Sequence, residues 1–197
     1  MRNSVAAITI LAFLSFVSLC AQGAEGAEVG QKAPAFSAQD QNGKVVQLAD
    51  FAGKIVVLEW LNPDCPFVQR HANEKTMLTL ADIYKDKDVV WLGINSGREA
   101  GNQADATWTQ DNKLSYPILN DNSSAIARAF GAKATPHMFV IDKTGKLAYK
   151  GAIDNDRNGD KTADKINYVA RALDEILSGK IVSTPETAAY GCGVKYR

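Results

Sequence analysis

The most reactive group that the sequence offers is Cys65, which follows a short apolar run and directly precedes a proline. The run Ile55 to Trp60 is rich in β-branched and large apolar side chains, which predicts a buried strand. Beyond Cys65 the pattern becomes helical, and Pro66 suits the first turn of a helix because its missing N–H costs nothing there. Cys65 is therefore expected at or beside the N-cap, where free N–H groups and the helix dipole favour the thiolate.

Two carboxylates lie near this sulfur in the sequence. Glu59 is six residues before Cys65, between Leu58 and Trp60, and we expect it to be buried because the strand is expected to be central. Burial raises the pKa of a carboxyl group, which a group that exchanges protons near neutral pH needs. The alternative is that Glu59 faces the solvent. The negative charge of Asp64 disfavours a second negative charge on the neighbouring Cys65, so the pKa of Cys65 is expected to be only moderately lowered.

The first 24 residues have the pattern of a secretory signal peptide. Arg2 gives a positive start, Val5 to Leu19 forms an apolar stretch, and small residues follow it. The apolar stretch is shorter than the roughly 20 residues that span a bilayer, which disfavours a retained anchor. A lipid anchor at Cys20 is disfavoured by the bulky Leu19 before it. The pattern predicts export to the periplasm or the extracellular space.

Export leaves Cys65 and Cys192 as the cysteines of the mature chain, in an oxidising compartment. They can form a redox couple or a permanent structural disulfide, or Cys192 can remain a free thiol. Cys192 lies between two glycines in a polar tail, residues 184–197, and could reach Cys65. As a resolving thiol, it would clear a mixed disulfide or a sulfenic acid formed at Cys65.

The elements expected from hydrophobic periodicity alternate between strand and helix, which indicates an α/β fold with parallel strand pairs. The expected elements are, in order, a hairpin over Val29 to Gly53 with an Asn42-Gly43 turn, the strand ending at Trp60, one helix from Cys65 to about Tyr84, a strand over Val89 to Ile94, a helix over Gln103 to Lys113, a strand over Tyr116 to Leu119, a helix from Asp121 to about Gly131, strands over Met138 to Asp142 and Leu147 to Lys150, and a helix over Thr162 to Ser178.

A βαβ unit with a cysteine at its first strand-to-helix junction, followed by Thr135-Pro136 before a hairpin and a closing helix, resembles the thioredoxin superfamily. The segments APAF, QNGK, LADFAGKIVVLEW, CPFV and YGCGVKY are similar to the redoxin branch, exported peroxiredoxin-like proteins of the alkyl hydroperoxide reductase/thiol-specific antioxidant type. This resemblance implies a thioredoxin fold: a central mixed sheet flanked by helices, with an N-terminal β-hairpin extension. It places the domain at residues 28–183, followed by the tail.

The resemblance also implies roles for single residues. Cys65 matches the attacking cysteine, whereas Val68 stands where a thioredoxin has its second cysteine. Thr135-Pro136 matches the superfamily's cis-proline, which lies against the sulfur and guides the substrate. Asn62 stands where a peroxiredoxin has a Thr or Ser that holds the peroxide.

Three further roles complete the predicted site. Glu59 resembles the buried acid that relays protons in thioredoxins. Cys192 is the candidate resolving cysteine. Asn62, Thr135 and Pro66 are expected to contact the substrate.

Composition and spacing give no sign of a metal, cofactor or nucleic-acid site. Lys plus Arg equals Asp plus Glu, 22 against 22, with no basic run. His71 and His137 lack partners at metal-ligand spacing, although a copper site formed by Cys65 and His137 is an alternative. The stretch Asp154 to Gly159 reproduces the first half of an EF-hand loop, but Lys165 occupies the twelfth position, which requires a glutamate. A polar turn is the better interpretation.

The predicted function is that of an exported thiol-based oxidoreductase, either a thiol-disulfide oxidoreductase or a peroxiredoxin-like peroxidase, acting through Cys65. Its partners would be a protein thiol or disulfide, or a peroxide, together with an unnamed reductant. The alternative is a non-catalytic thioredoxin-fold binding module with a structural Cys65–Cys192 disulfide.

Overall fold

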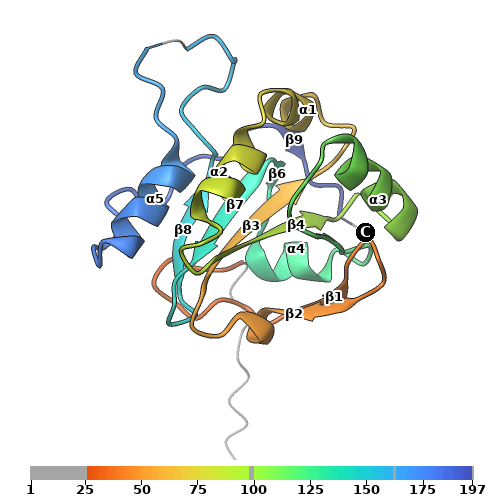
Figure 1. The fold of residues 1–197 in the computed structure, drawn as a ribbon, viewed down its shortest axis with the longest axis horizontal. Coiled ribbons are helices and arrows are strands. Elements are labelled where there is room, and N and C mark those ends of the chain that lie inside the picture. The colour runs from red at the N-terminus through yellow and green to blue at the C-terminus, as the bar shows by residue number, and fades with distance from the viewer. Residues whose placement is uncertain (1–25, 98–99, 162, 197) are drawn as a thin grey trace, which may run out of the picture.

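A five-stranded mixed sheet forms the centre of the molecule (Figure 1). The computed structural model describes residues 26–97, 100–161 and 163–196, so the predicted signal peptide lies outside the described residues. The strand order is β5-β4-β3-β7-β8. The strands are β3 (Ile55–Leu61), β4 (Val89–Asn95), β5 (Ile118–Asn120), β7 (His137–Ile141) and β8 (Leu147–Gly151).

The central strand β3 explains why the sheet is mixed. It pairs in parallel with β4 on one side and antiparallel with β7 on the other. All seven of its residues are buried, which agrees with its continuous apolar sequence. The carboxyl ends of β3 and β4 and the amino end of β7 therefore meet at one edge of the sheet.

Helices cover both faces of this sheet. The helices are α1 (Pro66–Asn73), α2 (Thr76–Tyr84), α3 (Asn102–Asp111), α4 (Ala125–Phe130) and α5 (Tyr168–Leu177), and a 3₁₀ helix spans Leu48–Phe51. One apolar cluster joins α2 and α5 to the sheet, and a second joins α4 and the N-terminal segment to its other face. Within the described part of the chain, no helix is long and apolar enough to cross a membrane.

An N-terminal hairpin precedes the sheet, as expected. It pairs β1 (Ser37–Gln39) with β2 (Val45–Gln47) in antiparallel register. The carboxylate of Asp40 accepts the N–H groups of Asn42 and Lys44, at 2.8 and 2.9 Å, and so closes the turn. Gly43 has a φ of +80°, which explains the glycine of the Asn-Gly pair.

Three helix boundaries differ from the expectation by more than two residues. The helix expected from Cys65 to Tyr84 is divided, because Lys75 takes a left-handed conformation with φ of 56° between α1 and α2. The closing helix, expected from Thr162, begins at Tyr168. Its N-cap is Asn167, whose side chain accepts the N–H of Ala170 at 2.9 Å.

The third difference concerns α4, whose N-cap is Ser124 rather than Asp121. Asp121, three residues before Ser124, still accepts hydrogen bonds from N–H groups in the first turn of this helix. Its carboxylate oxygens accept the N–H groups of Ile126 and Ala127 at 3.0 and 2.9 Å.

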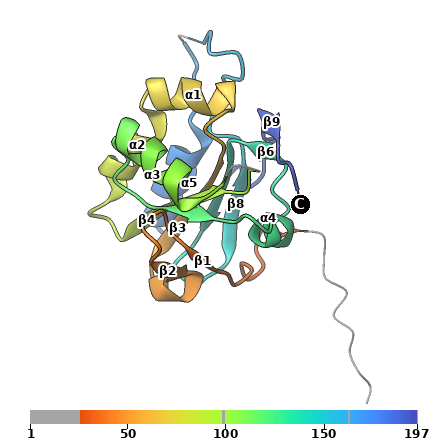
Figure 2. The ribbon, with the colours of Figure 1, turned by 90° about the vertical axis from the view of Figure 1, so that its right-hand side faces the viewer.

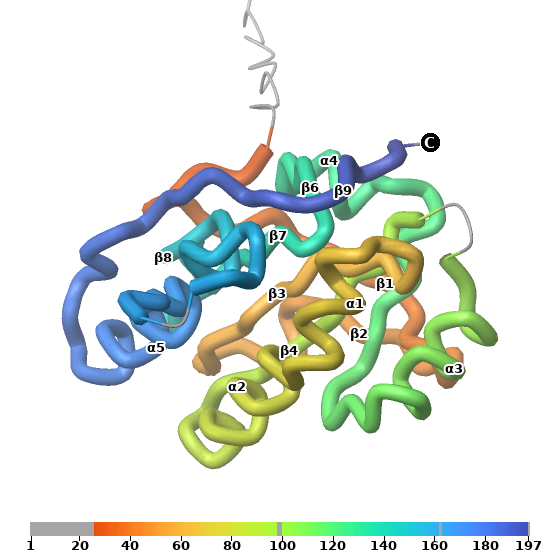
Figure 3. The backbone as a smooth tube through the Cα atoms, turned by 90° about the horizontal axis from the view of Figure 1, so that it is seen from above, coloured from red at the N-terminus to blue at the C-terminus, as the bar shows by residue number. Residues whose placement is uncertain are grey.

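The C-terminal tail packs against the domain. It runs past β8, where Lys150 donates its N–H to Pro185, and then reaches the region of β6 (Ala134–Thr135) (Figure 3). There β9 (Cys192–Gly193) pairs with β6 in antiparallel register, Thr135 opposite Cys192 (Figure 2). This pairing brings the far end of the sequence to the edge of the sheet where β3 ends.

Candidate active site

Cys65 lies where β3 passes into α1, as predicted. It is the N-cap residue of α1, and Pro66 occupies the first helical turn. The side chain of Cys65 is only 1% exposed. The thiol donates a hydrogen bond of 3.0 Å to the carbonyl oxygen of Thr135, and the Thr135–Pro136 peptide bond is cis, in agreement with the expectation. The sheet therefore assembles Cys65, Thr135 and Pro136 in one place.

Cys192 lies beside Cys65, and the two sulfurs are thiols in this structure. Burial acts to raise the pKa of Cys65, but hydrogen bonds from the side chains of Cys192 and Thr135 outweigh it and hold that pKa below the ordinary value. Burial and the neighbouring Cys65 raise the pKa of Cys192 to about 11. The arrangement thus favours Cys65 as the thiolate and Cys192 as the proton-bearing partner.

Glu59 is buried in the middle of the sheet, as predicted, with 4% of its surface exposed. Burial raises its pKa to about 7, although hydrogen bonds from Tyr116 and Trp91 partly oppose this rise. These donors lie 2.8 and 3.2 Å from its carboxylate. A cavity of about 20 Å³, lined by Glu59 and by Val68 of α1, lies beside the carboxyl group. That volume holds roughly one water molecule.

Asn62 has a structural task that the sequence did not indicate. Its side-chain oxygen accepts the N–H of Asp64 at 2.9 Å, while its backbone carbonyl accepts the N–H of Cys65 at 3.0 Å. Asn62 therefore shapes the turn that presents Cys65. It also lines a hollow of about 270 Å³ together with Thr135 and Gly193. Pro66 is exposed at the surface near this turn.

The two histidines are buried in separate environments. The ring of His137 accepts the backbone N–H of Lys133 at 3.1 Å and packs against Phe139 at 4.4 Å between ring centroids. His71 lies on α1, 3.0 Å from the hydroxyl of Tyr190. Burial lowers the pKa of each histidine to about 4. Within residues 26–97, 100–161 and 163–196, no cluster of three or more potential metal ligands is found.

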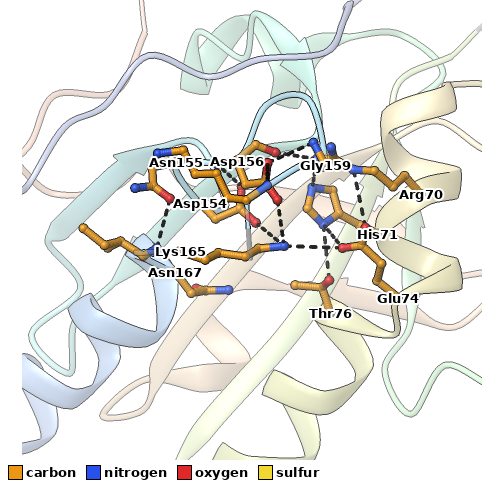
Figure 4. A network of polar contacts seen from close by, with 12 residues as sticks. Arg70, His71, Glu74, Thr76, Asp154, Asn155, Asp156, Gly159, Lys165 and Asn167 are labelled. Carbon is orange, nitrogen blue, oxygen red and sulfur yellow. Dashed lines mark hydrogen bonds and ion pairs between the residues drawn. The ribbon is translucent and has the colours of Figure 1, made fainter. Parts of the chain in front are cut away.

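The EF-hand-like stretch forms a loop in which the ammonium group of Lys165 lies among the acidic side chains. The ammonium of Lys165 lies 3.2 Å from Asp156, 3.5 Å from Asp154 and 3.6 Å from Glu74 of α1 (Figure 4). One oxygen of Asp156 also accepts the N–H groups of the turn that follows, including that of Gly159 at 2.9 Å. The lysine at the twelfth position of the motif therefore places a positive charge among the acidic side chains.

The sequence did not identify the residues that surround the predicted site. Tyr116 and Trp91 donate hydrogen bonds to Glu59. Trp91 lies in β4 and Tyr116 just before β5, and the sequence indicated only that both are apolar. Tyr190, two residues before Cys192, donates a hydrogen bond of 2.5 Å to buried Asp154. The signal for Tyr190 was only its place in the YGCGVKY segment.

Comparison with known proteins agrees with this architecture. A thiol-disulfide oxidoreductase ResA of Bacillus thuringiensis subsp. konkukian is 31% identical over 124 residues, which cover 61% of this chain and 67% of the relative. A putative thioredoxin of Neisseria meningitidis superposes with a TM-score of 0.53 at 27% identity, over 61% of this chain and 79% of that one. The fold is thus a thioredoxin fold.

A larger structural match extends over most of the chain. A hypothetical protein of Sinorhizobium meliloti 1021 superposes with a TM-score of 0.79 at 26% identity, over 87% of this chain and 96% of that one. Residues 29–150, which hold β1 to β7, all but the last residue of β8, and Cys65, match the AhpC/TSA family. The chain therefore belongs to the AhpC/TSA family.

Proposed function

We propose that this protein is a thiol-disulfide oxidoreductase that acts on disulfides of other proteins, with Cys65 as the nucleophile and Cys192 as the resolving thiol. The observation that carries the proposal is the position of Cys192. The β6–β9 pairing sets Cys192 beside Cys65, and the pKa values of the two thiols move in opposite directions. A ResA relative that is named as a thiol-disulfide oxidoreductase supports the same class of reaction.

The reaction proceeds in two exchanges. The thiolate of Cys65 attacks one sulfur of the partner's disulfide, forms a mixed disulfide and releases the other partner sulfur as a thiolate. Cys192 then loses its proton and attacks the sulfur of Cys65, which releases the second partner thiolate. Two electrons and two protons pass to the partner, and Cys65 and Cys192 end as a disulfide. An external reductant restores the two thiols.

Glu59 is proposed as the proton relay of this cycle. A carboxyl group with a pKa of about 7 can accept and return a proton near neutral pH. The small cavity between Glu59 and Val68 gives room for a water molecule on the way toward α1. Removing the carboxyl group should slow the exchange without changing how tightly a partner binds.

The partner must approach along the turn before α1. Cys65 is 1% exposed, so the tail has to move aside before the partner's disulfide can reach the sulfur. The adjoining hollow, lined by Asn62, Asp64 and Thr135, offers polar contacts for a partner segment. Asn62, Thr135 and Pro136 are proposed to contact the substrate there.

We also propose that the protein works outside the cytoplasm, because its first 24 residues have the pattern of a signal peptide. A fractionation experiment on the native host tests this, with mass spectrometry to determine the mature N-terminus. An unprocessed protein in the cytoplasmic fraction would refute the proposed location.

The proposed reaction is tested with the reduced protein and a peptide that contains a disulfide, followed by mass spectrometry. The wild type should release both peptide thiols and gain an internal disulfide. Cys65→Ser should not react, and Cys192→Ser should stop at a mixed disulfide on Cys65. If the peptide is reduced equally well by Cys65→Ser, the proposed role of Cys65 is wrong. A disulfide between Cys65 and Cys192 that resists reductants would instead favour the binding-module alternative.

A further inference from the structure

Tyr190 connects the tail to a buried carboxylate. Tyr190 is 7% exposed and lies two residues before Cys192. Its hydroxyl donates a hydrogen bond of 2.5 Å to Asp154, whose side chain is fully buried. A hydrogen bond to a buried charge is among the stronger single contacts in proteins, so this contact fixes the tail more firmly than an exposed one would.

Asp154 is itself held in place. The oxygen that accepts from Tyr190 also accepts the backbone N–H of Asp156 at 3.0 Å. The other oxygen lies 3.5 Å from the ammonium of Lys165, which also contacts Asp156 and Glu74 (Figure 4). Asp154 is therefore a rigid acceptor, and the cation of the EF-hand-like loop offsets its charge.

The same tyrosine contacts the helix that begins at Cys65. A ring nitrogen of His71 lies 3.0 Å from the hydroxyl of Tyr190, and a guanidinium nitrogen of Arg70 lies 3.4 Å from it. The ring of Phe67 packs 5.9 Å from the ring of Tyr190, centroid to centroid. Tyr190 thus touches the first and second turns of α1, and it fixes the tail relative to that helix.

Between Tyr190 and Cys192 the backbone of the tail is tightly packed against Thr135. Gly191 has a φ of +132°, and a Cβ atom at this position would lie 2.0 Å from the carbonyl oxygen of Thr135. The next residue, Cys192, pairs directly with Thr135. A shift of one residue in this pairing would turn the side chain of Cys192 to the opposite face. The position of Tyr190 therefore determines the register that brings Cys192 to Cys65.

We propose that Tyr190 is a positioning residue for the thiol pair: its hydrogen bond to Asp154 and its contacts with α1 hold Gly191–Gly193 in register on β6, so that Cys192 covers and resolves Cys65. This inference rests on the proposed function, because it assigns Cys192 the resolving step. It adds a residue that does not touch the reacting atoms. It also gives the EF-hand-like loop a role in keeping the acceptor Asp154 in place.

The first test measures how often the tail uncovers Cys65. Cys65 is alkylated with iodoacetamide in the Cys192→Ser background, on the plateau of its pH profile, and the modified peptide is quantified by mass spectrometry. Adding Tyr190→Phe should accelerate alkylation at least about tenfold, because the hydrogen bond to a charged group is lost. Asp154→Asn, which keeps the acceptor oxygen without its charge, should give a smaller increase.

Two controls define the range of this measurement. Tyr84→Phe removes another tyrosine–carboxylate hydrogen bond, a part-buried one of 2.7 Å to Asp174 between α2 and α5, and should leave alkylation unchanged. Gly191→Ala displaces the tail directly and should give the upper limit of the rate.

The second test measures positioning and uses chains that retain both cysteines. Oxidised glutathione is attacked by Cys65, which gives a Cys65–glutathione disulfide and one glutathione thiol; Cys192 then displaces the second glutathione and forms the Cys65–Cys192 disulfide. In Tyr190→Phe the release of the second glutathione should be several-fold slower than in wild type. A merely structural role would accelerate alkylation without slowing this release.

The outcomes separate the two proposals. If both Tyr190→Phe and Asp154→Asn behave as their parent chains in alkylation, or if Tyr190→Phe leaves glutathione release unchanged, the positioning role of Tyr190 is refuted. If the wild type itself never releases the second glutathione, the resolving role of Cys192 fails. If Tyr190→Phe does not fold, Asp154→Asn decides both measurements.

Discussion

The thiol of Cys65 donates a hydrogen bond to the carbonyl oxygen of Thr135, the residue that pairs with Cys192 in the neighbouring strand. One residue thus contacts both members of the thiol pair. The cis-proline segment and the tail form a single unit around the sulfur. This relationship makes the properties of Cys65 depend on the far end of the chain.

The ionisation of Cys65 should therefore change when Cys192 is replaced. Cys192→Ala removes the side-chain hydrogen bond from Cys192 to Cys65, so the pKa of Cys65 should rise. The rate of iodoacetamide alkylation, measured against pH, should show its midpoint at a higher pH than in the wild type. In the reciprocal variant, Cys65→Ser, the pKa of Cys192 should fall from about 11, because burial remains but the neighbouring thiolate is gone. Unchanged midpoints in both variants would contradict the coupling.

The buried carboxyl group of Glu59 should make stability decrease with rising pH. Its pKa is raised from 4.5 to about 7 in the folded protein, so between these values the unfolded chain loses a proton that the folded chain keeps. The stabilising contribution is complete below about pH 4.5 and is lost as the pH rises through 7. Relative to Glu59→Gln, the wild type should lose on the order of 3 kcal/mol over this range.

Urea unfolding at a series of pH values measures this difference. Glu28→Gln, at an exposed position, is the matched control and should follow the wild type. A constant difference between wild type and Glu59→Gln from pH 4.5 to 8 would show that Glu59 is not protonated in the folded state.

Replacing Lys75, at the break between α1 and α2, by glycine should stabilise the fold. Lys75 has a φ of 56°, a conformation that is costly for a residue with a Cβ atom and free for glycine. Lys75→Gly should raise the free energy of unfolding by up to about 1 kcal/mol, after the larger entropy of glycine in the unfolded chain is subtracted. Lys85→Gly, at a residue in right-handed helical conformation, should instead lower it by about 0.5–1 kcal/mol. Equal losses in both variants would argue against strain at Lys75.

Removing the cation of the EF-hand-like loop should destabilise the fold. Lys165→Met removes the cation shared by the carboxylates of Glu74, Asp154 and Asp156. Arg70, 3.9 Å from Glu74, remains nearby. Because Lys165 is 34% exposed, we expect a loss of about 1–2 kcal/mol and not the larger loss of a fully buried pair. Thermal unfolding measures it. Asp156→Asn in the same chain should recover part of the loss, whereas the control Lys161→Met should have little effect.

The strands of the central sheet could be predicted from the sequence because each is a buried apolar run. β3 and β4 were expected within a residue of their observed ends, since tight burial on both faces leaves a clear signal. The break at Lys75 could not be predicted, because no glycine or proline marks it. The start of α5 was placed too early, because the N-cap is Asn167 and the residue before it, Ile166, donates its N–H to the side chain of Asn155 at 2.9 Å.

The site could be predicted only where chemistry and local pattern coincide. Cys65 was found from its strand-to-helix junction, and the burial of Glu59 from its apolar neighbours. The partners of Glu59 and the anchor at Tyr190 depend on contacts between distant segments, such as the 36 residues that separate Tyr190 from Asp154. Local periodicity carries no information about such pairs.

The pairing of β9 with β6 also affects which oxidants can react. The tail is covalently attached, so it competes for the space beside Cys65 at an effective concentration that is about millimolar for short flexible connections. A small oxidant makes few contacts that could displace the tail, so it reacts with Cys65 only while the tail is spontaneously open. A protein partner gains enough contacts along the strand edge to displace it. We therefore expect the tail to slow the oxidation of Cys65 by small molecules more than its reaction with a protein partner.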